Sequence, residues 1–309
     1  MRSFLLYLSE SKRVAPLIIN NGVSRRVSKR FVAGETLDEA IAVARQVNAL
    51  GQSASLDQLG ENVTDEIGAR RVAEGYFATF DRITREKLDA NVSLKLTQLG
   101  LDLSQELCEE LIEKIVAHAT SMGNFVRIDM EGSAYTQRTV DITKKVRAKY
   151  IGTGTVMQSY LYRTEKDVED LLRAGCRMRL CKGAYNEPPE VAFAKKADVD
   201  ANYVKLMKLL LPSGIYHGIA THDPAMIQAT KDFAREKNIG RDQFEFQMLY
   251  GIRTDLQKKL TREGYRLRVY IPYGTDWFPY FMRRLAERPA NLMFFLRSFV
   301  PRASGNSAA

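Results

Sequence analysis

Two kinds of hydrophobic pattern alternate along the chain. Short runs of apolar and β-branched residues recur, and each is followed by a stretch in which apolar positions repeat every three or four residues. The first pattern is typical of a buried β-strand and the second of an amphipathic helix. The predicted strands are residues 53–59, 92–96, 125–130, 154–158, 177–182, 216–221, 244–249 and 266–271. Eight strand–helix units favour an α/β fold with a closed, parallel (βα)8 barrel over an open sheet.

Polar residues and glycines mark where the intervening helices begin and end. The predicted helix N-caps, each with a carboxylate one to three residues later, are Thr64, Ser104, Thr164 and Thr254. Gly60, Gly123, Gly175 and Gly264 interrupt the pattern between elements.

The chain is expected to have three parts. Thr36 and Glu39 form a capping box that opens a helix to about residue 50, so residues 1–50 are predicted as an added N-terminal helical arm. Residues 51–300 form the barrel, whose final helix, from about 277 to 287, is expected to cover the barrel mouth. Residues 301–309, rich in Ser, Gly and Ala, are predicted as a flexible tail.

Composition excludes several classes of protein. With 309 residues, 45% of them hydrophobic and 27% charged, the chain can bury a large core and is not disordered. No apolar run approaches the ~20 residues of a spanning helix, and the N-terminus lacks a signal-peptide cleavage site. Three cysteines without a C-x-x-C pair favour a reducing compartment, so we expect a cytoplasmic protein without a metal site.

The net charge of +9 is unevenly distributed. Residues 1–35 carry seven basic and two acidic side chains, and residues 253–309 carry eleven and four. Such basic ends are compatible with peripheral contact at the inner face of the cell membrane, with nucleic-acid binding, or with a solvated basic arm.

Polar side chains stand at the ends of seven predicted strands. Because the C-terminal strand ends of a (βα)8 barrel meet at its active site, these side chains are expected to converge. They are Lys95, Asp129, Gln158, Arg179, Lys182, Thr221, His222, Gln247 and Tyr270. Any one of them could merely satisfy a strand end, whereas seven strands in register indicate a site. This convergence also disfavours nucleic-acid binding as the main function.

The final helix carries a second set. Tyr280, Arg283, Arg284 and Glu287 have spacings i, i+3, i+4 and i+7 and therefore share one helix face. Two adjacent guanidinium groups can clamp a carboxylate or phosphate. The alternative is an ordinary solvated charged face.

These residues resemble those of one family, the proline dehydrogenases, which are flavoenzymes with a distorted (βα)8 barrel. The resemblance spans about residues 92–291 and is most specific in the combination of Arg179-Leu-Cys-Lys-Gly-Ala-Tyr185 with the stretch from Tyr270 through Arg283-Arg284-Leu-Ala-Glu287. Residues 1–50 do not contribute to it. Without an aldehyde dehydrogenase or DNA-binding domain, the chain is similar to the monofunctional bacterial form.

The resemblance implies roles for individual residues. FAD would be contacted by Met130, Gln158, Lys182, Gly183, Ala184, Thr221 and His222. Arg179 and Asp129 would be the catalytic residues, Arg179 near the flavin reaction centre and Asp129 holding the cationic groups, Lys95 included. The carboxylate of L-proline would bind Lys95, Arg283 and Arg284, and its ring would lie among Leu180, Tyr270 and Tyr280.

The resemblance also implies the reaction. L-Proline would be oxidised to Δ1-pyrroline-5-carboxylate, the first step of its conversion to glutamate, and the electrons would pass from the flavin to a membrane quinone. A pyrroline-5-carboxylate dehydrogenase would act on the product. A different class of enzyme stays open from the residues alone: an aldolase-type barrel in which Lys95 or Lys182 forms a Schiff base.

Overall fold

Eight parallel strands close into a barrel in sequence order, so the predicted (βα)8 architecture is confirmed. The computed structural model describes residues 28–60 and 63–287. The strands are β1 (Ser53–Gln58), β2 (Ala90–Leu94), β3 (Val126–Ile128), β4 (Thr153–Gln158), β5 (Arg177–Cys181), β6 (His217–Ala220), β7 (Phe244–Leu249) and β8 (Leu267–Tyr273). The pairing of β1 with β8, from Ser53 opposite Arg268 to Gln58 opposite Tyr273, closes the barrel.

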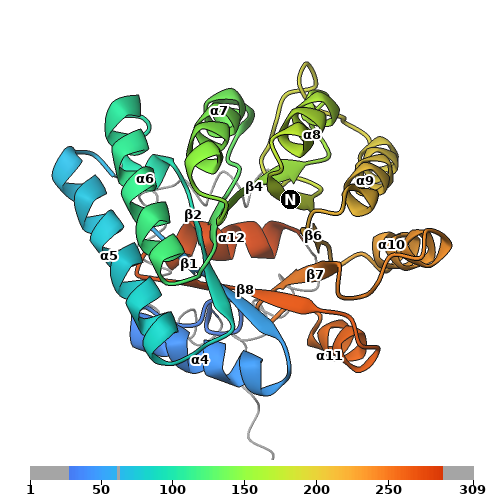
Figure 1. Cartoon of the computed structure of the whole chain (residues 1–309), viewed down its shortest axis with the longest axis horizontal. Helices are drawn as coiled ribbons and strands as arrows, with labels where there is room; N and C mark the ends of the chain where they lie inside the picture. Colours follow the sequence, from blue (N-terminus) through green and yellow to red (C-terminus); the bar gives the residue numbers. More distant parts are fainter. Residues whose placement is uncertain (1–27, 61–62, 288–309) are drawn as a thin grey trace, which may run out of the picture.

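Helices surround this barrel (Figure 1). They are α4 (Leu37–Ala49), α5 (Glu66–Arg85), α6 (Gln105–Ser121), α7 (Ser133–Lys149), α8 (Thr164–Arg173), α9 (Lys196–Leu210), α10 (Pro224–Glu236), α11 (Thr254–Arg262) and α12 (Trp277–Glu287), with 3-10 turns at Thr97–Leu99 and Leu211–Ser213.

The first and last of these helices explain the distortion of the barrel. Helix α4 packs against β1 and β8 and lies between α5 and α11 in the outer ring. It therefore occupies the place that the helix after the last strand takes in a regular barrel. Helix α12 instead runs across the middle of the ring (Figure 1), as the sequence predicted. Of the predicted N-terminal arm, residues 1–27 lie outside the described residues, as does the predicted tail at 301–309.

Two helix starts agree with the sequence. The capping box of α4 is confirmed, since the Glu39 amide donates to Thr36 Oγ1 at 3.3 Å and the Thr36 amide donates to Glu39 Oε2 at 3.1 Å. Ser104 caps α6 by accepting the Leu107 amide at 3.2 Å.

Three predicted caps are wrong by one residue. Asp65, rather than Thr64, caps α5 by accepting the Gly68 amide at 2.7 Å. Thr164 is inside α8, where its hydroxyl donates to the carbonyl of Gln158, and Thr254 likewise begins α11 after its N-cap. Propensity identified the right turns, but the hydroxyl of Thr164 is used to tie the helix to its preceding strand.

The hydrophobic core lies between the strands and the helices and forms two large clusters. One joins β1–β3 and most of β8 to α4–α7, and the other joins β4–β7 and the start of β8 to α7–α11. The interior of the barrel is polar by contrast. Its buried side chains include Ser55, Asp57, Ser93, Arg127, Arg179, Glu245 and Gln247. The barrel therefore holds a charged interior inside an apolar shell.

No helix among residues 28–60 and 63–287 is long and apolar enough to cross a membrane.

Candidate active site

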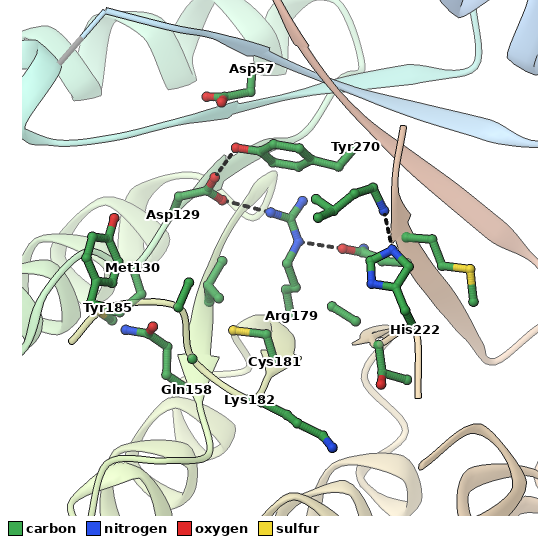
Figure 2. Close-up of a pocket in the computed structure, with 18 of the residues that line it drawn as sticks. Asp57, Asp129, Met130, Gln158, Arg179, Cys181, Lys182, Tyr185, His222 and Tyr270 are labelled. Atoms are coloured by element: carbon green, nitrogen blue, oxygen red, sulfur yellow. Dashed lines mark hydrogen bonds and ion pairs between the residues drawn. The ribbon is translucent and has the colours of Figure 1, made fainter. Parts of the chain in front are cut away.

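The C-terminal strand ends surround a cavity of about 490 Å³ (Figure 2). The structure brings together here most residues that the sequence singled out. They are Lys95, Asp129, Met130, Gln158, Arg179, Lys182, Gly183, Ala184, Thr221, His222, Gln247, Tyr270, Tyr280 and Arg284. They come from β-strands all around the barrel, the loops after them, and α12.

Arg179 projects from β5 into the centre of this cavity and is only 7% exposed. Its Nη1 donates to Asp129 Oδ1 at 2.8 Å, its Nη2 donates to Ser93 Oγ at 3.0 Å, and its Nε donates to Gln247 Oε1. Its guanidinium carbon lies 5.1 Å from the centre of the Tyr270 ring. The positive charge is therefore held in one position from four sides.

Asp129 also binds Tyr270. The Tyr270 hydroxyl donates to Asp129 Oδ2 at 2.8 Å, so the two oxygens of this carboxylate have different partners (Figure 2). Burial raises the pKa of Tyr270 well above its usual value, and the negative charges of Asp129 and Asp57 raise it further. Tyr270 is accordingly a neutral hydrogen-bond donor.

The ion pair of Lys95 differs from the expectation. Its Nζ lies 3.3 Å from Asp57 Oδ1 on β1, whereas Asp129 is the partner of Arg179. We expected Asp129 to hold Lys95 in place, but Asp57 is the carboxylate that pairs with it. Strand register places both carboxylates near Lys95, because Asp57 lies opposite Ser93 on one side and Ile128, the residue before Asp129, lies opposite Leu94 on the other. Asp129 is instead engaged on both oxygens, by Arg179 and Tyr270.

Asp57 is a site residue that the sequence analysis missed. It is fully buried and lines the cavity, and burial raises its pKa to about 6, against the lowering effect of Lys95 and with a further rise from Asp129. The same criterion that identified the other site residues, a polar side chain near the C-terminal end of a predicted strand, could have identified Asp57. Asp57 is the acidic residue near the end of the first predicted strand.

Lys182 lies at the rim of the cavity between two carboxylates. Its Nζ donates to Asp223 Oδ2 at 2.7 Å and to Asp200 Oδ1. Lys196 joins the same cluster, 3.5 Å from Asp223. The rim thus carries a balanced group of two cations and two anions, which come from the residue after β5, from α9 and from the N-cap of α10.

The loop after β5 forms one wall. Gly183 has a φ of +120°, and a Cβ there would lie 2.3 Å from Cδ1 of Tyr160. Only glycine fits without moving the Tyr160 ring. Glu187 fixes the far end of this loop by accepting the amide of Ser133, the first residue of α7, at 2.7 Å.

His222 and Gln158 are held by the backbone. The Leu249 amide donates to His222 Nε2 at 2.9 Å, which leaves the ring proton of the neutral imidazole on Nδ1. Gln158 Nε2 donates to the Glu131 carbonyl at 2.9 Å. Both side chains are therefore oriented at the cavity wall (Figure 2).

Helix α12 supplies the cover of the cavity. Tyr280 and Arg284 line it, are 6% and 8% exposed, and stack with the guanidinium carbon 5.0 Å from the ring centre. This is not a solvated charged face. The side chains of Arg283 and Glu287 lie outside the described residues.

Leu180 does not line the cavity, contrary to the expectation that it would contact the substrate ring. It is fully buried in the apolar shell outside the barrel. Successive side chains of a strand point to opposite faces. Because Arg179 and Cys181 face the cavity, Leu180 between them faces the helices.

Comparison with known proteins shows the family of the chain. Residues 40–297 match the family described as proline dehydrogenase. The chain is 46% identical over 293 residues to proline dehydrogenase 2 of Bacillus subtilis (strain 168), covering 95% of this chain and 96% of that protein. It is 39% identical over 283 residues to the proline dehydrogenase of Deinococcus radiodurans, covering 89% of this chain and 90% of that one.

A solved structure shares the fold. The crystal structure of proline utilization A (PutA) from Bdellovibrio bacteriovorus, inactivated by N-propargylglycine, superposes with a TM-score of 0.82 at 26% identity. The match covers 90% of this chain and 34% of that longer one. With a matching family profile over most of its length and relatives of this similarity, the chain belongs to the proline dehydrogenases, a family of oxidoreductase enzymes.

Proposed function

We propose that this enzyme oxidises L-proline to Δ1-pyrroline-5-carboxylate with FAD bound across the strand ends, and that a membrane quinone takes up the electrons. The observation that carries the proposal is the buried Arg179, fixed by Asp129 and Gln247 at the centre of the cavity. FAD, when bound, supplies the hydride acceptor. A preorganised cation beside it stabilises the negative charge that a reduced flavin acquires.

The cavity has the properties that a flavin requires. Its volume is in the usual range for cofactor sites, and it has apolar walls with a few fixed polar groups. Gly183 keeps one wall flat where any side chain would meet Tyr160. The residues proposed to hold FAD are Met130, Gln158, Lys182, Gly183, Ala184, Thr221 and His222, all of which line the cavity.

The substrate end of the cavity is proposed to lie between β2, β8 and α12. Proline combines a carboxylate with a mostly apolar ring, so its site needs cations on one side and apolar surface on the other. Lys95 and Arg284 provide the cations, and Tyr270 and Tyr280 provide the ring surface. Arg283, whose side chain is outside the described residues, is proposed to complete the carboxylate clamp.

The Schiff-base alternative is disfavoured by the partners of the two lysines. A lysine must be neutral to attack a carbonyl group. Lys95 is paired with Asp57, and Lys182 lies between Asp200 and Asp223. Nearby carboxylates favour the charged ammonium and therefore oppose this chemistry.

The test uses the full chain expressed with riboflavin available. We expect a yellow protein whose flavin absorbance bleaches on anaerobic addition of L-proline, with a product that mass spectrometry shows to have lost two hydrogens. Hydroxyproline, tested in parallel, measures specificity for the ring. A colourless folded protein would refute the FAD proposal, and a borohydride-trapped substrate adduct on Lys95 or Lys182 would establish the aldolase reading instead.

The acceptor and the membrane contact are proposed from charge. The basic residues near both ends of the chain would attract an anionic membrane surface, at ~1 kcal/mol each, and bring the enzyme to its quinone. Binding to anionic vesicles should then be lost at high salt. Equal sedimentation with anionic and neutral vesicles would contradict the contact, and failure of a short-chain quinone to reoxidise the proline-reduced enzyme would contradict the acceptor.

A further inference from the structure

Two carboxylates are buried in the cavity, and each is paired with a cation. Asp129 pairs with Arg179, and Asp57 pairs with Lys95. The Asp57 and Lys95 side chains are only 1% and 8% exposed, so this second pair is shielded from bulk water. The proposed mechanism uses Lys95 but gives Asp57 no role.

The two pairs differ in how tightly they are built. Asp129 has contacts of 2.8 Å on both oxygens, one from Arg179 and one from Tyr270. The oxygens of Asp57 lie 3.3 and 3.5 Å from Lys95 Nζ. Lys95 also carries a compact charge on a flexible stem, which can shift toward a new partner more readily than a bidentate guanidinium.

A carboxylate ligand creates a conflict at Lys95. When it binds, two carboxylates share one ammonium in a site with little water, and like charges at close range favour protonation of one of them. The ligand carboxylate keeps other cations, since Arg284 also lines the cavity. Asp57 is therefore the carboxylate that loses its counter-ion.

The surroundings of Asp57 favour the same outcome. Burial is the main cause that raises its pKa to about 6; Asp129 also raises the pKa, whereas Lys95 and, to a smaller extent, the Tyr270 hydroxyl lower it. Weakening the contact with Lys95 removes the main opposing influence. The titratable and charged groups that face Asp57 from the described elements are Lys95 near β2, Asp129 after β3, Arg179 on β5, Tyr270 and Tyr273 on β8, and Tyr76 on α5.

We propose that Asp57 holds Lys95 in position in the free enzyme and accepts a proton from solvent when the carboxylate of the substrate binds Lys95. The negative charge of the ligand carboxylate and one proton then enter the site together, so these two charges cancel. No bond other than the O–H bond on Asp57 is formed. The inference rests on the proposed function, because it takes Lys95 as the binding site of the substrate carboxylate.

The proposal predicts the direction in which ligand affinity changes with pH. Binding that takes up a proton weakens as the pH rises, by up to about tenfold per pH unit for one proton. The pH range in which affinity falls begins near pH 6, the pKa of Asp57 in the free enzyme, and ends at the higher pKa that Asp57 has in the complex. A purely structural Asp57 would leave affinity independent of pH in this range.

The experiment measures protons directly. Cyclopentanecarboxylate has the ring and carboxylate of the substrate but no amine to oxidise or titrate. Its binding to the holoenzyme is followed by calorimetry at pH 7 in two buffers of different ionisation enthalpy, which yields the number of protons taken up. We expect wild type to take up a large fraction of one proton, and no uptake by wild type would overturn the proposal without any variant.

Two matched variants show which carboxylate takes up the proton. Asp57→Asn should abolish uptake and make the dissociation constant independent of pH between 6 and 8, whereas Asp129→Asn should retain uptake. Loss in Asp129→Asn with retention in Asp57→Asn would overturn the assignment. Should Asp57→Asn fail to fold, Lys95→Met serves, because Asp57 without its ammonium is already protonated and uptake must vanish.

The two proposals fail in different ways. An enzyme that oxidises proline but binds the ring carboxylate without proton uptake refutes the role of Asp57 alone. An enzyme that neither binds flavin nor oxidises proline refutes the proposed function itself.

Discussion

The guanidinium of Arg179 donates to Asp129 Oδ1 at 2.8 Å, while the other oxygen of the same carboxylate accepts the Tyr270 hydroxyl. One buried carboxylate just after β3 therefore links a cation of β5 to a phenol of β8. Because Asp129 and Arg179 are buried and Tyr270 is half-buried, each depends on the others for its hydrogen bonds. This linkage makes the side chains around the cavity centre sensitive to the loss of a single oxygen atom.

Removing the Tyr270 hydroxyl tests that linkage. In Tyr270→Phe the ring surface remains but Asp129 loses a donor, so Arg179 is held less firmly. We expect kcat/KM for proline to fall about tenfold, the equivalent of about 1.5 kcal/mol for a hydrogen bond to a charged group. Tyr273→Phe is the control, because its hydroxyl contacts Thr79 outside the cavity. Equal losses in both variants would show that the effect is not specific to Asp129.

Arg284 is expected to act in carboxylate binding. Arg284→Lys keeps the positive charge but loses the planar fork and the stacking on Tyr280. We expect the KM for proline to rise by about five- to 150-fold, or ~1 to 3 kcal/mol, with flavin content retained. Steady-state kinetics and the flavin-to-protein absorbance ratio measure the two effects. An unchanged KM would remove Arg284 from the clamp.

Gly183 is expected to be essential for the flavin site. In Gly183→Ala the new Cβ would meet the Tyr160 ring at 2.3 Å, so the loop or the ring must move. We expect flavin content to fall severalfold. Gly123→Ala is the matched control, since Gly123 also has a positive φ, +67°, but has open space around its Cβ position. That variant should lose about 1 kcal/mol of stability and retain its flavin.

His217 is expected to make the fold sensitive to acid. Burial lowers its pKa to about 3, and Arg127 lowers it further. Its Nδ1 accepts the Met178 amide at 3.0 Å, a bond that protonation destroys. The lowered pKa means that its stabilising contribution is fully present above pH 6.5, the unfolded value, and is lost as the pH falls toward 3.

The measurement compares His217→Asn with wild type, because the difference between them cancels the other titrating groups. Unfolding by urea at several pH values should show a steeper loss of stability below pH 6.5 in wild type, by up to about 1.4 kcal/mol per pH unit. Parallel pH profiles would contradict a neutral, buried His217.

The sequence by itself determined the architecture and most of the residues that line the cavity. Eight alternating units specify a closed barrel, and barrel geometry brings the ends of all strands to one opening. Residues as distant as Lys95 and Tyr270 could therefore be assigned to one cavity from their positions at strand ends alone. The face of α12 could be read from helical spacing in the same way, since the structure brings both Tyr280 and Arg284 into the cavity.

The tertiary structure decided which side chain contacts which. Strand register places both Asp57 and Asp129 near Lys95, but Lys95 pairs with Asp57 because Arg179 of β5 and Tyr270 of β8 engage both oxygens of Asp129. No local pattern encodes these contacts between distant strands. Leu180 faces the apolar shell because Arg179 beside it faces the polar barrel interior. Strand alternation requires these two residues to point apart, but only the closed barrel, with its charged interior, determines which of them points inward.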